Sequence, residues 1–152
     1  MKILKLFEFK RNETNMDEIF IHLSKCEYDF KPNLSSYVDL NLYSKKLFEK
    51  AERFEVWKNE SLIGLLAVYI NKNDNSLFIS NLSLDKELRG QNIGTKLIDF
   101  MLNDFKTNNI FFESIRLEVK KDNIIAIKFY ERYGFKFLTL GVGDVMIYEK
   151  KI

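Results

Sequence analysis

The segment from Leu62 to Ile70 is apolar almost without interruption, and it constrains the fold more than any other part of the sequence. A strand of this kind is buried on both faces, so it needs a central place in a sheet that is covered on both sides. Phe54 to Lys58 and Leu77 to Leu84 have the pattern of strands and are joined to it by short polar turns. Together the three segments predict an antiparallel meander at the centre of the fold.

The apolar spacing on either side of this meander alternates between the periods of strands and helices. Asn15 and Asn123 are suited to cap helices that follow them, and Gly134 is suited to end the second of these. The other expected elements are a strand over 2–9, helices over 16–23 and 43–51, a helix over 97–105, a strand over 115–119, the helix after Asn123, and a hairpin of strands over 135–140 and 145–148. This order, β-α-α-β-β-β-α-β-α-β-β, predicts a single mixed α/β domain over residues 1–152.

The composition excludes several classes of function. With 46% hydrophobic residues the chain is expected to fold, and a formal net charge of +2 gives no field that attracts nucleic acid or an anionic membrane. Cys26 is the only cysteine and His22 the only histidine, which disfavours a disulfide, a Ser-His-Asp triad and a metal site. We expect His22 to lie at the surface or to be partly packed. Met1 to Phe9 lacks the apolar run of a signal peptide and no segment is long enough to span a membrane, so we expect a cytoplasmic protein.

The loop from Arg89 to Thr95 joins the end of a predicted strand to the start of a predicted helix. Unpaired backbone N–H groups at a helix start, together with the helix dipole, form a site for anions. Gly90 and Gly94 permit a close approach between the backbone and a phosphate. Asn92 tolerates the left-handed conformation, and Arg89 adds a cation. The loop therefore suits a pyrophosphate group.

Two common phosphate loops do not match this segment. A Walker A loop has four residues between its glycines and then Gly-Lys-Ser/Thr, whereas three residues separate Gly90 from Gly94 and Thr95-Lys96 follows. The dinucleotide fingerprint Gly-x-Gly-x-x-Gly is also absent from the segment. The sequence thus disfavours a P-loop nucleotidase and a Rossmann dehydrogenase.

Two segments of the chain resemble motifs of the GNAT family of N-acetyltransferases. Arg89-Gly90-Gln91-Asn92-Ile93-Gly94 resembles the acyl-CoA signature Gln/Arg-x-x-Gly-x-Gly/Ala, with Asn92 in place of the first glycine. The segment from Asn123 to Phe135 resembles the family's Asn-x-x-Ala-x-x-Phe-Tyr-Glu-Lys-x-Gly-Phe. The resemblance implies an acetyltransferase fold, acetyl-CoA as co-substrate, and direct acetyl transfer to a primary amine in a ternary complex.

The resemblance also implies a set of site residues. CoA is expected in the cleft between the strands that contain Leu82 and Leu117, and Tyr130 resembles the family's general acid. Glu118 resembles the glutamate that some members use as a base, and an acyl-enzyme through Cys26 is less favoured because this residue is far in sequence from both motifs. The residues expected to contact CoA are Leu82, Ser83, Leu84, Arg89, Gly90, Gln91, Asn92, Ile93, Gly94, Thr95 and Asn123.

Several alternatives remain open at this point. Tyr130 also fits a core aromatic, Glu118 an outward-facing strand charge, and Asn123 a simple helix cap. The aromatic residues after the first helix fit either an acceptor pocket or packing; they are Tyr28, Phe30, Tyr37 and Tyr43. The acceptor could be a small metabolite, an amino sugar, an antibiotic or a peptide N-terminus, and a homodimer is left open. The alternative functions are a non-catalytic acyl-CoA binding or sensing module and a nucleotide-phosphate binder.

Overall fold

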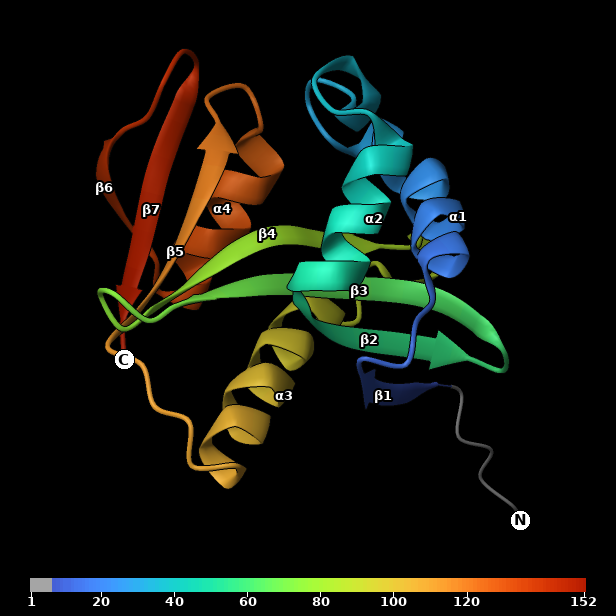
Figure 1. The fold of residues 1–152 in the computed structure, drawn as a ribbon. Coiled ribbons are helices and arrows are strands. Elements are labelled where there is room, and N and C mark those ends of the chain that lie inside the picture. Colours follow the sequence, from blue (N-terminus) through green and yellow to red (C-terminus); the bar gives the residue numbers. More distant parts are fainter. Residues whose placement is uncertain (1–6) are drawn as a thin grey trace.

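The computed structural model describes residues 7–152 and has the element order that the sequence predicts (Figure 1). The predicted first strand over 2–9 lies mostly outside the described residues, and the first strand observed is β1 (Glu8–Arg11). The other elements are α1 (Met16–Cys26), α2 (Leu40–Lys50), β2 (Glu52–Lys58), β3 (Ser61–Asn71), β4 (Ser76–Leu84), α3 (Ile93–Thr107), β5 (Ser114–Lys120), α4 (Ile124–Tyr133), β6 (Lys136–Leu140) and β7 (Val145–Lys151). Short 3-10 turns lie at Glu27–Asp29, Leu34–Ser36 and Lys86–Leu88.

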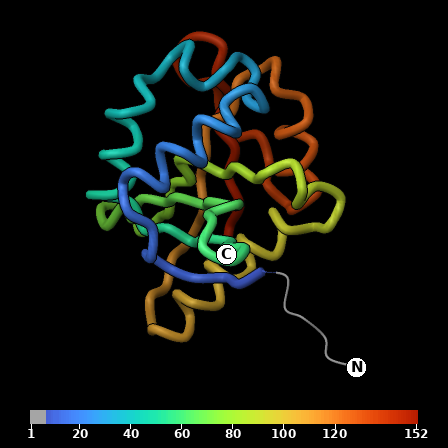
Figure 2. The backbone as a smooth tube through the Cα atoms, turned by 90° about the vertical axis from the view of Figure 1, so that its right-hand side faces the viewer, coloured from blue at the N-terminus to red at the C-terminus, as the bar shows by residue number. Residues whose placement is uncertain are grey.

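The strands form one sheet in the order β1-β2-β3-β4-β5-β7-β6, with β4 and β5 as the parallel pair. The predicted meander is β2-β3-β4, and the predicted C-terminal hairpin is β6-β7. Helices α1 and α2 cover one face and helices α3 and α4 the other, as the side view in Figure 2 shows. Leu65 and Ala67 of β3 pack with the first pair of helices, while Leu66 and Val68 pack with the second. Strand β3 is therefore central and buried on both faces, as predicted.

Strands β4 and β5 diverge after a short paired stretch (Figure 1). Their last paired residues are Ile79 and Leu117, beyond which β4 continues to Leu84 without a neighbour on that side. Opposite β3, the register shifts so that Ser80 has no partner between Ile79 and Asn81. A bulge of this kind bends a strand and re-aims its side chains. The result is a gap in the sheet, and the candidate site is built around it.

His22 is buried, not at the surface or partly packed as its sequence context suggested. It is 1% exposed, and its Nε2 lies 2.9 Å from Ser83 Oγ of β4. On α1 it shares a face with Ile19, Leu23 and Cys26, which are also buried. These residues follow the spacing i, i+3, i+4, i+7, so the helix presents all four to the sheet. The expectation was wrong because the helical spacing of His22 outweighs its polar character.

The described part of the chain contains no helix that is long and apolar enough to cross a membrane.

Candidate active site

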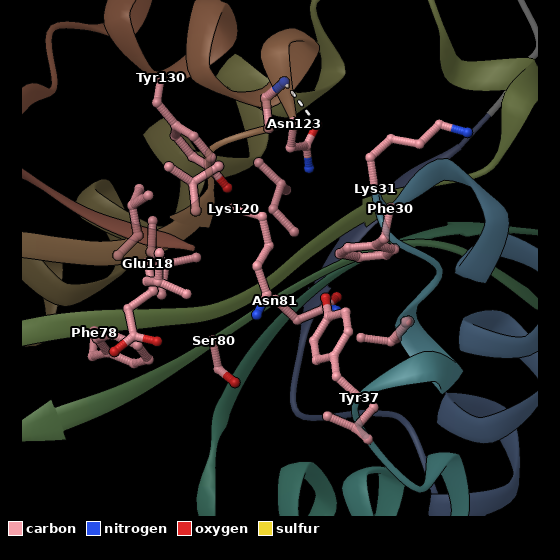
Figure 3. Close-up of a pocket in the computed structure, with 18 of the residues that line it drawn as sticks. Phe30, Lys31, Tyr37, Phe78, Ser80, Asn81, Glu118, Lys120, Asn123 and Tyr130 are labelled. Carbon is pink, nitrogen blue, oxygen red and sulfur yellow. Dashed lines mark hydrogen bonds between the residues drawn. The ribbon is translucent and has the colours of Figure 1, made fainter. Parts of the chain in front are cut away.

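A pocket of about 320 Å³ occupies the gap between β4 and β5 (Figure 3). Helix α4 forms one side of it, and the connection between α1 and α2 forms another. Four predicted site residues line it: Leu82, Glu118, Asn123 and Tyr130. The remaining predicted residues lie farther along β4 and in the following loop, outside the pocket lining; they are Ser83, Leu84 and Arg89 to Thr95. The predicted site residues thus fall into two groups, one in the pocket and one in the loop after β4, and strand β4 joins the two groups.

Tyr130 of α4 combines core packing with access to the pocket. Its side chain is 8% exposed, and its ring packs edge-to-face on Phe129 and Phe135, with centroid distances of 5.2 and 5.5 Å. Its hydroxyl points into the pocket (Figure 3). Burial, and to a lesser degree the nearby Tyr43, raises the pKa of Tyr130 above its ordinary value. The phenol therefore keeps its proton at neutral pH and is available as a proton donor.

Glu118 of β5 and Tyr130 of α4 lie on the same side of the gap but come from opposite faces of the sheet, because Tyr130 packs with Leu117 and Val119. Glu118 projects from the face of β5 opposite to Leu117 and Val119, which are buried in the core, and it is exposed. Glu118 and Phe78 both line the pocket (Figure 3). The pocket is therefore lined by both a phenol and a carboxylate, which come from opposite faces of the sheet.

The N-terminus of α3 differs from those of the other α-helices. Asn92 precedes the helix with φ of 58°, the left-handed conformation that the sequence predicts, and no side chain caps the helix. The first backbone bond of the helix joins Lys96 N–H to the Asn92 carbonyl, so the preceding N–H groups have no helical partner. Side chains do cap the other α-helices; they are Asn15, Asp39 and Asn123. The amino end of α3 is thus the one that offers its N–H groups to an anion.

The two glycines of the loop are needed for different structural reasons. Gly90 has φ of 76°, which favours glycine, and a Cβ at this position would meet no atom within 4 Å. Gly94 lies in α3, where a Cβ would lie 3.0 Å from Cζ of Phe129. The close approach that Gly94 permits here is therefore between α3 and α4.

Arg89 joins the loop to the α1–α2 connection. Its guanidinium forms an ion pair with Asp29, and its side chain is 54% exposed. In the same loop, Gln91 donates a side-chain hydrogen bond to the Glu87 carbonyl at 2.8 Å. The predicted cation is therefore present at the loop, and in this structure it is paired with the carboxylate of Asp29 from the neighbouring segment.

Beneath β4 lies a buried hydrogen-bond chain that the sequence motifs do not indicate. Ser83 donates its hydroxyl hydrogen to Asn81 Oδ1 at 2.8 Å, so its oxygen is free to accept from Nε2–H of His22 at 2.9 Å. Burial lowers the pKa of His22 to about 4, which leaves the imidazole neutral. The signal that could have revealed this chain is the helical spacing of His22 with apolar neighbours.

Three of the four aromatic residues after α1 lie at the pocket. Phe30, Tyr37 and Tyr43 line the pocket, whereas Tyr28 is 65% exposed and does not. Tyr43 also donates a hydrogen bond to the Ser80 carbonyl at 2.9 Å, at the bulge of β4. The connection and the start of α2 therefore form a pocket wall, and Tyr43 of α2 bonds this wall to the bulge.

Cys26 lies apart from the pocket lining, beside His22 at 3.8 Å from Nε2. Burial raises the pKa of the Cys26 thiol to about 12, and the nearby Asp29 adds to the effect. A thiol that stays protonated is a poor nucleophile, so the structure gives no support to an acyl-enzyme at this residue. Among residues 7–152, no group of three or more His, Cys, Asp or Glu side chains is arranged to hold a metal ion.

Known proteins similar to this chain are acetyltransferases. The model of the acetyltransferase (GNAT) family matches residues 16–135. N-alpha-acetyltransferase 30 of Schizosaccharomyces pombe is 43% identical over 58 residues, and this match spans 38% of the present chain and only 37% of the relative.

Solved structures extend the similarity to the whole fold. The PaiA N-acetyltransferase of Thermoplasma acidophilum in complex with coenzyme A superposes with a TM-score of 0.71 at 17% identity, covering 95% of this chain and 99% of that one. The ribosomal-protein-S18-alanine N-acetyltransferase of Escherichia coli gives 0.73 at 15% identity, with 96% and 94% covered. An acetyltransferase of Streptococcus agalactiae gives 0.74 at 19% identity, with 98% and 100% covered.

Proposed function

The chain belongs to the GNAT acetyltransferase family, and from this premise we propose that it transfers the acetyl group of acetyl-CoA to a primary amine. The observation that carries the proposal is the path along β4. This strand leaves the pocket in the sheet at Leu82 and leads directly to the uncapped amino end of α3. Acetyl-CoA is a long ligand with a thioester at one end of its pantetheine arm and a pyrophosphate at the other. The pocket and the loop suit these two ends.

Acetyl-CoA is proposed to bind through backbone groups more than through side chains. The backbone N–H groups from Gly90 to Thr95 lie at the amino end of α3, where the helix dipole favours an anion such as the pyrophosphate. Arg89 adds a positive charge beside them. The free edge of β4 near Leu82 and Leu84 offers backbone groups to the pantetheine amides. Asn123 caps α4 with Oδ1 and lines the pocket, so its amide nitrogen can also reach the pantetheine arm.

The proposed reaction is direct attack of the amine on the thioester. A bond forms between the amine nitrogen and the carbonyl carbon, and the bond between that carbon and sulfur breaks. Glu118 accepts the proton that the amine loses, and Tyr130 donates a proton to the departing sulfur. The raised pKa of Tyr130 keeps the phenol protonated until the sulfur departs. The same buried surroundings also raise the pKa of the departing thiol, so the sulfur remains able to accept this proton.

The positions of Glu118 and Tyr130 support one direction of approach for the acceptor amine. Glu118 projects from the face of the sheet that α1 and α2 cover, and Tyr130 comes from α4 on the other face. The acceptor is therefore proposed to enter between the α1–α2 connection and β5. A covalent intermediate is unnecessary because amine and thioester meet in the gap.

The rival function is an acyl-CoA binding module without turnover. Acetyl transfer is tested by incubating the protein with acetyl-CoA and a panel of primary amines, and by measuring thiol release together with the mass of the product. We expect Tyr130→Phe to lower kcat at least tenfold while the Kd of acetyl-CoA stays within about twofold. Tyr133→Phe is the matched control, because this hydroxyl is on the same helix but bonds to Asp99 at 2.6 Å outside the pocket lining.

The outcomes separate the candidate functions. Acetylated product with a loss confined to Tyr130→Phe supports the enzyme and the assigned proton donor. Tight acetyl-CoA binding without product from any amine favours the sensing module. Binding of ATP in preference to acetyl-CoA favours a nucleotide-phosphate binder.

A further inference from the structure

Lys120 places an unpaired positive charge at the acceptor side of the pocket. It lies on β5 beyond the last residue paired with β4, and it lines the pocket. Its Nζ lies 4.9 Å from the centroid of the Tyr37 ring. Across residues 7–152 it forms no ion pair. An aromatic face holds an ammonium group without neutralising it, so Lys120 remains able to bind an anion.

Asn81 places an unpartnered hydrogen-bond donor on the strand that faces Lys120 across the gap. The residue is 2% exposed, and its Oδ1 is occupied by the hydroxyl of Ser83. Its Nδ2 is buried and makes no hydrogen bond of ordinary geometry with the described residues, although the Tyr43 hydroxyl lies near the Asn81 side chain. Two other buried groups share this property, the hydroxyls of Ser44 and Tyr69, but neither residue lines the pocket. A buried donor without a partner destabilises the folded protein, so it is a place where a ligand oxygen is favoured.

The two donors are on the same face of the sheet as Glu118. The side chain of Asn81 lies on the face of β4 that packs toward α1, as does that of its β3 partner Ala67. Lys120 and Glu118 alternate with buried Val119 on β5 and therefore share the opposite face from the core around α4. Lys31 also lines the pocket, but its side chain extends away from this group (Figure 3). The acceptor side thus presents the Glu118 carboxylate together with the Lys120 ammonium group and the Asn81 amide.

We propose that the acceptor is an amino acid or a similar amine that carries a free carboxylate, which Lys120 and Asn81 bind while the amine lies at Glu118. This inference rests on the proposed acetyl transfer and names its acceptor class. The carboxylate satisfies the free Asn81 donor and the unpaired Lys120 cation together. Asn81 directly follows the bulge residue Ser80, where the sheet opens to the acetyl group. Glu118 and Lys120 are two residues apart on the same face of β5, so a carboxylate bound at Lys120 lies only a few bonds from an amine at Glu118.

The test compares free α-amino acids with their α-amides as acceptors. The two members of each pair have the same side chain and differ in carboxylate or carboxamide. Because a carboxamide lowers the pKa of the amine, kcat/KM is compared for the unprotonated amine. We expect at least one free amino acid to exceed its amide at least tenfold in kcat/KM. Lys120→Gln is expected to reduce this preference to less than threefold, with the KM for acetyl-CoA unchanged.

Two further variants show whether the effect belongs to the carboxylate. Lys31→Gln is the matched control, since it also removes a pocket lysine, and it should retain the preference. Asn81→Asp replaces the free donor with a negative oxygen and should weaken turnover of the acid more than turnover of the amide. Because each variant is judged on the ratio between two acceptors, a general loss of folding or activity does not move the readout.

The outcomes distinguish this inference from the function on which it rests. The proposed acceptor class would be overturned, and acetyl transfer left intact, by either of two results. One is that the amides are acetylated with the same efficiency as the free acids, and the other is that the preference survives in Lys120→Gln. Acetyl-CoA binding without acetylation of either acceptor type would also overturn the acceptor class. A wild-type protein that does not bind acetyl-CoA would refute the proposed function itself.

Discussion

The burial of His22 predicts that the protein loses stability in mild acid. The imidazole is 1% exposed, and burial lowers its pKa from the ordinary 6.5 to about 4. Between these values the unfolded chain binds a proton that the folded chain does not, so the free energy of unfolding falls as the pH decreases from 6.5 toward 4. Above pH 6.5 the contribution is fully present. At pH 5 the expected loss is about 2 kcal/mol, and it reaches about 3 kcal/mol below pH 4.

Urea unfolding at pH 7 and pH 5 measures this loss when wild type is compared with His22→Gln. Glutamine can bond to Ser83 but does not titrate, and the acidic residues that also titrate are common to both proteins. The difference between the two pH values should therefore be about 2 kcal/mol smaller in the variant. Since His22 is the only histidine, its NMR titration gives an independent check that does not depend on the variant. Equal pH dependence in both proteins, or a His22 pKa near 6.5, would refute the account of this buried group.

Three further changes test the site and its supports. Glu118→Gln should lower kcat/KM for the amine about 100-fold in steady-state kinetics and leave the Kd of acetyl-CoA unchanged, since it removes only the proposed base; an unaltered rate would assign proton removal elsewhere. Asp29→Asn frees Arg89 from its ion pair, and isothermal titration should show acetyl-CoA binding tightened by about twofold to fivefold, whereas unchanged or weaker binding would contradict the competition. Gly94→Ala places a methyl group against Phe129 and should lower the free energy of unfolding in urea by about 1 kcal/mol, because crowding costs more than the helix propensity that alanine gains. A neutral or stabilising result would mean that Phe129 moves aside without strain.

The fold could be predicted from the sequence because its elements carry local signals. The apolar run of β3 indicated a strand covered on both faces, and α1 and α2 cover one face while α3 and α4 cover the other. Asn123 does cap α4, and Gly134 ends it in the left-handed conformation. Asn92 adopts the positive φ that its place in the loop required. Each of these features depends on a few neighbouring residues.

The acceptor side of the pocket could not be predicted in the same way. The missing partner at Ser80 depends on pairing between β3 and β4, which no local pattern of β4 specifies. Asn81 and Lys120 are far apart in the sequence and share a pocket because β4 and β5 diverge after their paired stretch. His22 was misjudged because polar character was weighed above helical spacing. Long-range packing determines these features, and motifs report only the part of a site that lies on one continuous segment.

Acetyl-CoA binding to the wild-type protein, measured by isothermal titration against ATP, tests the central claim most directly. The account predicts that acetyl-CoA binds in preference to ATP and that Arg89→Glu weakens it at least tenfold. Lys45→Glu makes the same change of charge at an exposed position of α2, and this variant should bind acetyl-CoA as the wild type does. No heat of binding with acetyl-CoA, or equal binding of ATP, would contradict the assignment of this loop and pocket to an acetyl-CoA-dependent enzyme.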